Sequence, residues 1–272
     1  MTQAAVREYV QPRVPEPAAV IDLLGVPVDA VTLAQAAERI VGDAKMGVGG
    51  WVITPNLDIL RRVVRQPTFR RMYDLSTLRL ADGMPLVWAS KVRGTPLPER
   101  VAGSDLIFAL AAKAAERGAS LFLLGGNPGA AEQTASVLRE RYPGLVIAGT
   151  LCPPMGFEKD PEEFARIVSA VQAASPELVL VALGSPKQEQ VIEQLRPLLP
   201  RAWFLGIGIT FSFVAGEVRR APMWMRRVGL EWMHRMVQEP RRLVRRYLID
   251  GVPFAVYLLA ASAVQRFIGP RS

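Results

Sequence analysis

The chain has 272 residues, of which half are hydrophobic and only 21% are charged, and this composition excludes a disordered protein. Its 33 Lys and Arg against 25 Asp and Glu give a formal charge of +8, which is typical of proteins that bind nucleic acid or an anionic membrane surface. Nearly all of this excess lies in residues 219–246, which hold nine Arg, no Lys and two Glu, so the rest of the chain is almost neutral.

The first residues predict a leader followed by a hairpin. Residues 1–19 contain three prolines and several charges but no apolar run, so we expect a flexible leader and no signal peptide. The alternation over residues 20–31 predicts a short β-hairpin that turns at Gly25. Thr32 with Gln35 three residues later forms a capping box, which predicts a helix that runs to about Asp43.

The next part of the chain alternates between apolar runs of strand length and helical stretches. Because these strands are apolar throughout, they indicate an α/β fold: a mostly parallel, Rossmann-like sheet flanked by helices, over residues 20–218. The predicted strands are 51–54, 78–81, 120–126, 145–149, 177–184 and 202–208. The predicted helices are 57–64, 67–75, 85–91, 128–141, one that starts at Asp160, and 186–195.

The alternation stops after Gly216, where an Arg-rich helical pattern begins. We therefore expect a helical C-terminal appendage over residues 219–272, which Glu239-Pro240 and Gly251–Pro253 divide into about three short helices. Its uncharged run, residues 251–265, is shorter than the roughly 20 residues that span a bilayer. The expectation is a cytoplasmic protein without a transmembrane helix.

Polar side chains follow the first two long strands, at the place where ligands gather in parallel sheets. Thr54 and Asn56 follow the first strand, and the simplest interpretation of this loop is a capped helix start. Asp82 follows the second strand, where it could cap a helix or act as a general base in a partly desolvated cleft. The sequence leaves these two interpretations of Asp82 open.

Glycines stand at the ends of the later strands. Gly125-Gly126 follow the third strand, and Gly184 begins a loop that continues to Gln188 and Glu189. Glycine lets a ligand approach the backbone, and the helix starts that follow favour an anion. Neither loop has a dinucleotide or P-loop motif, but together they favour a nucleotide or another phosphorylated ligand.

The sequence contains few groups that could form a metal site. It has no Asp-x-Asp pair, and its single Cys152 and single His234 exclude a disulfide within the chain and a His-based metal site. If the protein binds a diphosphate, arginines must supply the positive charge, a role that guanidinium groups suit. We predict neither a metal nor a cofactor.

Seven segments together resemble the WecG/TagA/CpsF family of bacterial glycosyltransferases. They stand in the family's order and cover roughly residues 20–248, and the last two are the most specific. They are TPNLDIL (54–60), ADG (81–83), RVAGSDL (100–106), LFLLGG (121–126), GSPKQE (184–189), GIGITFSFVAGEVRRAP (206–222) and GLEWMHRMVQEPRRLVRRY (229–247).

The resemblance implies an inverting, metal-independent transfer of a sugar from a nucleotide donor to a polyprenyl-diphosphate-linked sugar. The best-known members use UDP-N-acetylmannosamine for teichoic acid linkage units or enterobacterial common antigen, and relatives act in exopolysaccharide assembly. Two departures, Pro85 and Ser212, stand where the family often has glycine and aspartate. They leave another UDP-sugar, such as a glucose-type donor, as the alternative.

The resemblance also implies roles for individual residues. Asp82 would be the general base, and Thr54 and Asn56 would line its pocket. The nucleotide is expected near Gly125, Gly126, Gly184, Gln188 and Glu189, and the arginines that match those assigned to the diphosphate are Arg235, Arg242 and Arg245. The appendage would close over the active site.

The basic appendage also fits a membrane surface. Trp224, Met225, Trp232, Met236 and Tyr247 lie among its arginines, although they could simply be core residues. We expect a cytoplasmic enzyme bound peripherally to the inner face of the membrane, with no nucleic-acid partner; the sequence predicts no oligomeric state. The rivals are a nucleic-acid-binding protein with an Arg-rich arm, an oxidoreductase that lacks the dinucleotide motif, and a non-catalytic membrane scaffold.

Overall fold

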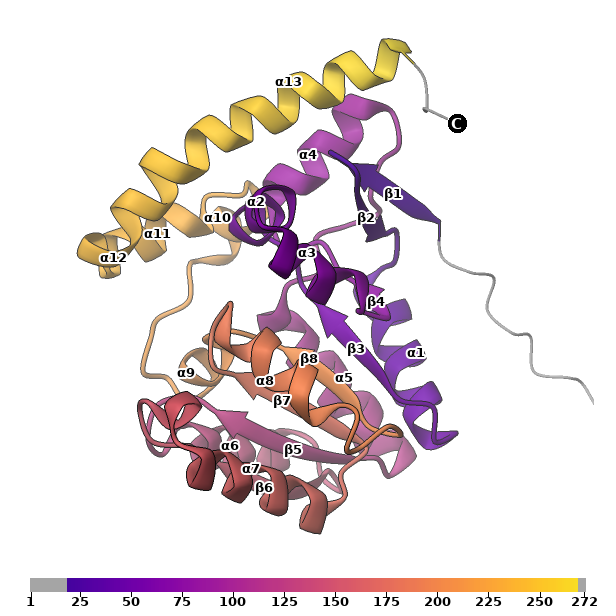
Figure 1. Cartoon of the computed structure of the whole chain (residues 1–272), viewed down its shortest axis with the longest axis vertical. Helices are drawn as coiled ribbons and strands as arrows, with labels where there is room; N and C mark the ends of the chain where they lie inside the picture. Colours follow the sequence, from indigo (N-terminus) through magenta and orange to yellow (C-terminus); the bar gives the residue numbers. More distant parts are fainter. Residues whose placement is uncertain (1–18, 269–272) are drawn as a thin grey trace, which may run out of the picture.

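The computed structural model describes residues 19–268, without the side chains of Arg227 and Arg242. The predicted leader therefore lies outside the described residues except for Ala19. The described chain forms a β-hairpin, a six-stranded parallel sheet between helices, and a helical C-terminal part (Figure 1). The predicted α/β class with a parallel, helix-flanked sheet is confirmed.

The sheet brings together strands that are far apart in the sequence. Its order is β4-β3-β8-β7-β5-β6, and every neighbouring pair is parallel. The carboxyl ends of all six strands therefore lie at one edge, with the ends of β4, β3, β8 and β7 side by side. The strands are β3 (Gly50–Ile53), β4 (Leu78–Arg79), β5 (Ser120–Gly125), β6 (Val146–Leu151), β7 (Leu178–Ala182) and β8 (Trp203–Gly206).

Helices cover both faces of the sheet, and side chains alternate between them as the pleat requires. One buried cluster includes side chains from α1 (Leu33–Lys45), α5 (Gly103–Arg117), α6 (Ala130–Arg141) and α9 (Thr210–Val214). The other includes side chains from α2 (Leu57–Arg65), α3 (Pro67–Asp74), α7 (Pro161–Ala174), α8 (Lys187–Leu195) and the hairpin β1 (Val20–Leu23) and β2 (Val26–Asp29). A 3-10 turn, η1 (Phe157–Lys159), precedes α7.

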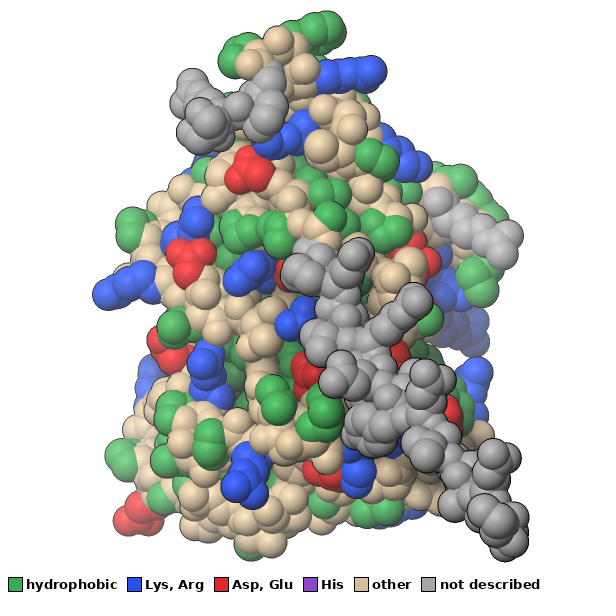
Figure 2. All heavy atoms as spheres, turned by 90° about the vertical axis from the view of Figure 1, so that its right-hand side faces the viewer, with side chains coloured by type: hydrophobic (Ala, Val, Ile, Leu, Met, Phe, Trp, Pro, Cys, Tyr) green, Lys and Arg blue, Asp and Glu red, His purple; other side chains and the backbone are tan. Residues whose placement is uncertain are grey.

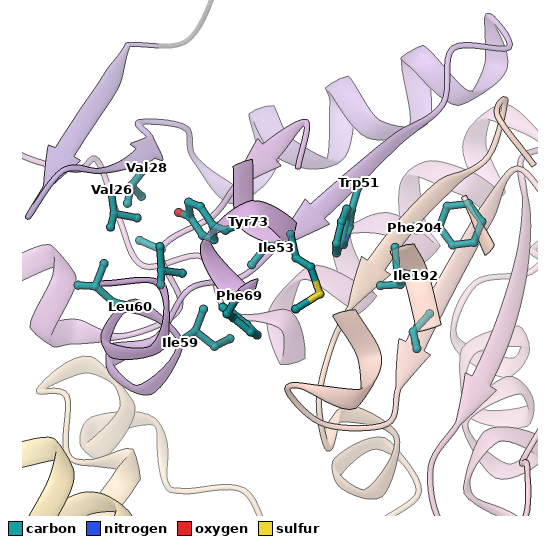
Figure 3. Close-up of a cluster of buried hydrophobic side chains, with 14 of the residues drawn as sticks. Val26, Val28, Trp51, Ile53, Ile59, Leu60, Phe69, Tyr73, Ile192 and Phe204 are labelled. Atoms are coloured by element: carbon teal, nitrogen blue, oxygen red, sulfur yellow. The ribbon is translucent and has the colours of Figure 1, made fainter. Parts of the chain in front are cut away.

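The hydrophobic core joins the sheet to the helices and the hairpin that pack on one of its faces. Trp51 and Ile53 of β3 point toward α2 and α3, whereas Val52 between them belongs to the cluster on the opposite face. Figure 3 shows Trp51 and Ile53 near Phe69 and Tyr73 from α3. The hydroxyl of Tyr73 donates a hydrogen bond of 2.7 Å to the carbonyl of Pro27, so the hairpin is fixed to this helix.

Helix α5 is not among the helices that the sequence predicted. Its buried residues, Leu106, Ile107, Leu110, Ala111 and Ala114, follow the helical period, and α5 packs against α1 over the sheet. No side chain caps its first turn, which begins at Gly103. The capping signal that marked the helix starts at Thr32 and Asp160 was therefore absent, although the periodicity could have revealed this helix.

The appendage, defined here as residues 219–268, contains α10 (Met223–Arg227), α11 (Glu231–Gln238), α12 (Pro240–Val244), a π-helical segment η2 (Arg245–Gly251) and α13 (Val252–Ile268). Figure 1 shows α13 lying along α4 (Met84–Arg93), and Phe254 and Leu258 are buried there in the core cluster. Gly229 of the appendage lies so close to Met84 that a Cβ atom would come within 2.7 Å of its side chain.

The predicted break at Gly251–Pro253 is wrong, because η2 runs directly into α13. A proline ring clashes with the carbonyl four residues earlier in an α-helix, but here that residue, Ile249, belongs to the wider π-helical segment. The predicted helix length was therefore too short. Arg245–Ile268 forms 24 helical residues that include an 18-residue window with a mean hydropathy of 1.6, long and apolar enough to cross a membrane, and part of it is buried inside the protein.

Candidate active site

A cavity of about 650 Å³ lies at the carboxyl edge of the sheet, between the strand ends and the appendage. The strand ends contribute five residues that the sequence analysis singled out, and the appendage contributes side chains from α11 and η2. The five are Thr54, Asn56, Asp82, Gly184 and Gln188; the appendage side chains are Glu231, Trp232, Arg235, Arg246 and Tyr247. The structure thus gathers most of the predicted site in one place.

Thr54 and Asn56 are fixed by hydrogen bonds to the backbone. The Thr54 hydroxyl donates to the carbonyl of Gly206 at 3.3 Å and so ties β3 to β8. Asn56 caps α2, since its Oδ1 accepts from the N–H groups of Asp58 and Ile59 at 3.1 Å each. The capping interpretation of this loop is correct, and the same loop lines the cavity.

Asp82 does not cap a helix. The N-cap of α4 is Gly83, which makes no side-chain capping bond, and the carboxylate of Asp82 instead accepts from the N–H of Gly103. Burial raises the pKa of Asp82 to about 6, and the negative charges of Glu231 and Asp105 add to this effect. Arg100 and the Gly103 N–H oppose it. A carboxyl group with this pKa can both accept and release a proton near neutral pH.

A cluster of ion pairs beside Asp82 joins the appendage to the sheet domain. We call Arg100, Asp105, Arg220, Arg226 and Glu231 the seam cluster. Arg100 Nη1 lies 2.8 Å from Glu231 Oε2, and Arg220 contacts both oxygens of Asp105 at 2.7 and 2.8 Å. Arg226 Nη1 lies 3.5 Å from Asp105 Oδ1. These contacts connect residues more than 100 positions apart in the chain.

In the seam cluster, ion pairs with arginine stabilise the charged form of Asp105. Burial alone would raise the pKa of Asp105, but the hydrogen bonds and charge of Arg220 hold it below its usual value. The segments that resemble the family contain Arg100, Asp105, Arg220 and Glu231, but the resemblance implied no role for these residues. Their pairing could not be identified, because it depends on how the chain folds back.

The loops after β7 and β8 are joined by Gln188. Its Oε1 accepts from the N–H of Gly208 at 3.0 Å, and its Nε2 donates to Glu189 Oε1 at 3.0 Å. Glu189 is buried behind the loop and does not line the cavity, and burial raises its pKa. Gln188 therefore belongs to the cavity wall, whereas Glu189 lies outside the cavity and contacts its wall through the hydrogen bond with Gln188.

Gly125 and Gly126 lie elsewhere. Gly126 lines a second cavity of about 750 Å³, together with the following loop and Cys152, and Gly125 lines neither cavity. At Gly125, which has φ +100°, a Cβ atom would lie 2.7 Å from the carbonyl oxygen of Ala182, so close packing against β7 requires glycine there. The role of these two glycines in nucleotide binding remains a prediction.

The three predicted diphosphate arginines have different positions. Arg235 lines the cavity, with its guanidinium carbon 5.9 Å from the centre of the Phe213 ring. Arg245 is exposed and does not line the cavity, whereas its neighbour Arg246, which the sequence analysis did not select, does. The side chain of Arg242 lies outside the described residues.

The charged groups of the cavity suit an anion. Four arginines line it, namely Arg61, Arg100, Arg235 and Arg246. Within residues 19–268, no three His, Cys, Asp or Glu side chains are grouped so that they could hold a metal ion. The arrangement combines a proton acceptor with several guanidinium groups, which can stabilise a negatively charged leaving group.

Comparison with known proteins shows the family of the chain and a curated relative. A sequence model of the glycosyl transferase WecG/TagA/CpsF family matches residues 21–267. An N-acetylglucosaminyldiphosphoundecaprenol N-acetyl-beta-D-mannosaminyltransferase of Bacillus spizizenii (strain W23) is 34% identical over 208 residues, which cover 76% of this chain and 79% of the relative.

The raised pKa of Asp82 predicts how stability depends on pH. The pKa is about 6 in the folded protein and about 3.9 for an unfolded Asp, so ionisation of Asp82 disfavours folding. The wild-type protein should therefore lose stability relative to Asp82→Asn as the pH rises from about 4 to about 6. Urea unfolding of both proteins from pH 4 to pH 8 measures this difference, and a difference that stays constant over the range would contradict it.

Proposed function

Since this chain belongs to the WecG/TagA/CpsF family and is a glycosyltransferase, we propose that it moves N-acetylmannosamine from UDP-N-acetylmannosamine to a polyprenyl-diphosphate-linked sugar. The observation that carries this proposal is Asp82, which has a pKa near 6 in a cavity lined by four arginines. The name of the Bacillus spizizenii relative supports both the donor sugar and the acceptor class. The product would enter cell-wall or exopolysaccharide assembly.

The proposed reaction is a single displacement. Asp82 takes the proton of an acceptor hydroxyl, whose oxygen forms a bond to the anomeric carbon of the donor sugar. The bond from that carbon to the diphosphate oxygen breaks on the opposite face, so the configuration inverts and UDP leaves. Thr54 and Asn56, which line the same cavity, would orient the reacting groups.

Arginines would take the place of a metal ion in this reaction. Charge develops on the diphosphate as it leaves, and a guanidinium group can stabilise it through two parallel hydrogen bonds. Arg235 lines the cavity and is the predicted diphosphate ligand best placed for this role. The proposal therefore includes metal independence, and the transfer rate should not change when EDTA is present.

The donor sugar has one alternative. Pro85, which replaces the glycine often found in the family, lines the cavity close to Gly83 and could alter the sugar site. Ser212, the other departure, is buried, and Asn127 Nδ2 lies 3.5 Å from its hydroxyl. A glucose-type UDP-sugar is therefore the second donor to test.

We also propose that the appendage rests on the cytoplasmic face of the membrane, where the lipid-linked acceptor lies. Most of the exposed large hydrophobic side chains of the described chain belong to the appendage, among them Trp224, Val237, Ile249, Val256 and Phe267. Because one side of α13 is buried against α4, we expect this helix to lie on the bilayer surface and not to cross the bilayer.

The distribution of basic side chains also favours this surface over nucleic acid. Figure 2 shows only the side of the molecule next to the hairpin, and on this face Lys and Arg side chains are scattered among acidic and hydrophobic ones. A nucleic-acid site needs a basic patch or stripe. In the appendage, exposed arginines such as Arg241 and Arg245 lie in the same segment as exposed apolar side chains, which suits an anionic lipid surface.

The role of Asp82 predicts the effect of its substitution on transfer. Asp82→Asn should lower the rate by about 100- to 10,000-fold, the usual contribution of a general base, and should bind UDP as the wild type does. The assay follows transfer from UDP-N-acetylmannosamine and from UDP-glucose to an N-acetylglucosaminyl-diphosphate lipid. Wild-type transfer rates in the variant would exclude Asp82 as the base.

The membrane surface predicts the effect of charge on α13. Val256→Glu and Phe267→Glu place a carboxylate on exposed apolar positions, so both should reduce sedimentation with anionic vesicles several-fold. Val146→Glu, at an exposed position on β6, is the matched control and should sediment like the wild type. Equal sedimentation of all four proteins would show that the appendage is not the membrane-binding surface.

A further inference from the structure

The cavity has a second charged region, formed by residues of α2 and η2. Arg61 of α2 and Arg246 of η2 line the cavity there. Both contact Asp58: Arg61 Nη2 lies 3.2 Å from its Oδ1, and Arg246 Nη2 lies 3.1 Å from its Oδ2. Arg62 also contacts Asp58 at 3.0 Å, and Arg61 Nη1 lies 3.0 Å from Asp250. We call these five residues the Asp58 cluster.

The hydrogen-bonding capacity of this cluster is not filled. The Nε atoms of Arg61 and Arg246 are buried and have no hydrogen-bond partner in the described part of the chain, and the same is true of Arg235. A buried donor on a charged group is costly when it is left unpaired, so a site of this kind favours an anion as its ligand. All three arginines line the cavity.

The charges of the cluster leave a positive excess. Three arginines face two carboxylates, Asp58 and Asp250, and Asp58 is nearly buried. Asp58 thereby fixes the guanidinium groups of Arg61 and Arg246 in place on two different elements, α2 and η2. A group with two negative charges, such as a diphosphate ester, would complement the cluster.

The surroundings of the cluster point to a diphosphate that carries a lipid. Gly251, Val252 and Ala255 continue the cavity wall along η2 and α13. Val252 and the neighbouring Leu248 and Ile249 expose apolar side chains to the outside. The charged cluster therefore lies next to the apolar surface that we assign to the membrane, where a polyprenyl chain would leave the cavity. A nucleotide donor has no apolar chain that would use this path.

We propose that Arg61 and Arg246, held in place by Asp58, bind the diphosphate of the lipid-linked acceptor and not that of the nucleotide donor. This inference rests on the proposed transfer reaction. It divides the cavity into an acceptor side at the Asp58 cluster and a reaction centre at Asp82. It also assigns a function to Arg61, a partly buried arginine on α2 that lies outside the basic appendage.

Binding measurements test this assignment without catalysis. Arg61→Gln and Arg246→Gln should each weaken the binding of farnesyl diphosphate in detergent about tenfold or more, because each removes charge-assisted hydrogen bonds. Both variants should bind UDP within twofold of the wild type, and this also shows that they are folded. Arg241→Gln, which changes an exposed arginine on the neighbouring helix α12, is the matched control and should bind both ligands normally.

The outcomes separate this inference from the proposed function. Unchanged farnesyl diphosphate binding in both variants would overturn it, and an equal loss of UDP binding in variants that keep the wild-type circular dichroism spectrum would assign the cluster to the donor instead. In transfer assays, each variant should raise KM for the lipid acceptor and leave KM for the donor unchanged. If the wild type transferred no sugar, the proposed function would fail, while the binding measurements would still decide whether the cluster holds a lipid diphosphate.

Discussion

The ion pair between Arg100 and Glu231 is the interaction on which the cavity depends. It joins the loop before α5 to the first turn of α11, and Arg220 and Asp105 extend it on the same side. Because Arg100 and Glu231 both line the cavity, a contact that helps to dock the appendage also sets the charges around Asp82. Docking of the appendage and the proton affinity of the proposed base are thus coupled by one contact.

The electrostatics of this region oppose stability and favour chemistry. Burial and two neighbouring carboxylates keep the pKa of Asp82 near 6, which costs folding free energy at neutral pH and gives the proposed base a suitable proton affinity. In the seam cluster beside Asp82, guanidinium groups reduce the cost of burying a carboxylate, as Arg220 does for Asp105. The contact of α13 with α4 also holds the appendage in place, and because it is apolar it buries no further charged groups.

Local patterns predicted the strands, the cap at Asn56 and the parallel sheet, because these depend on neighbouring residues. Three other features could not be predicted from the sequence, because they depend on how the whole chain folds. Pro253 predicted a break between two helices, but the π-helical segment before it allows one continuous helix. The order of the strands places Gly125 apart from the cavity, although its loop looks like the others. The partners Arg100 and Glu231 are 131 positions apart, and no local signal connects them.

The most direct test of the account is a double-mutant cycle on the Arg100–Glu231 pair, with kcat/KM for sugar transfer as the measured quantity. If the two side chains act through one contact, Arg100→Gln and Glu231→Gln will each lower kcat/KM, and the double variant will be no slower than the slower single variant. If instead the two losses multiply in the double variant, the residues act independently, and the coupling between appendage docking and the proposed base is wrong.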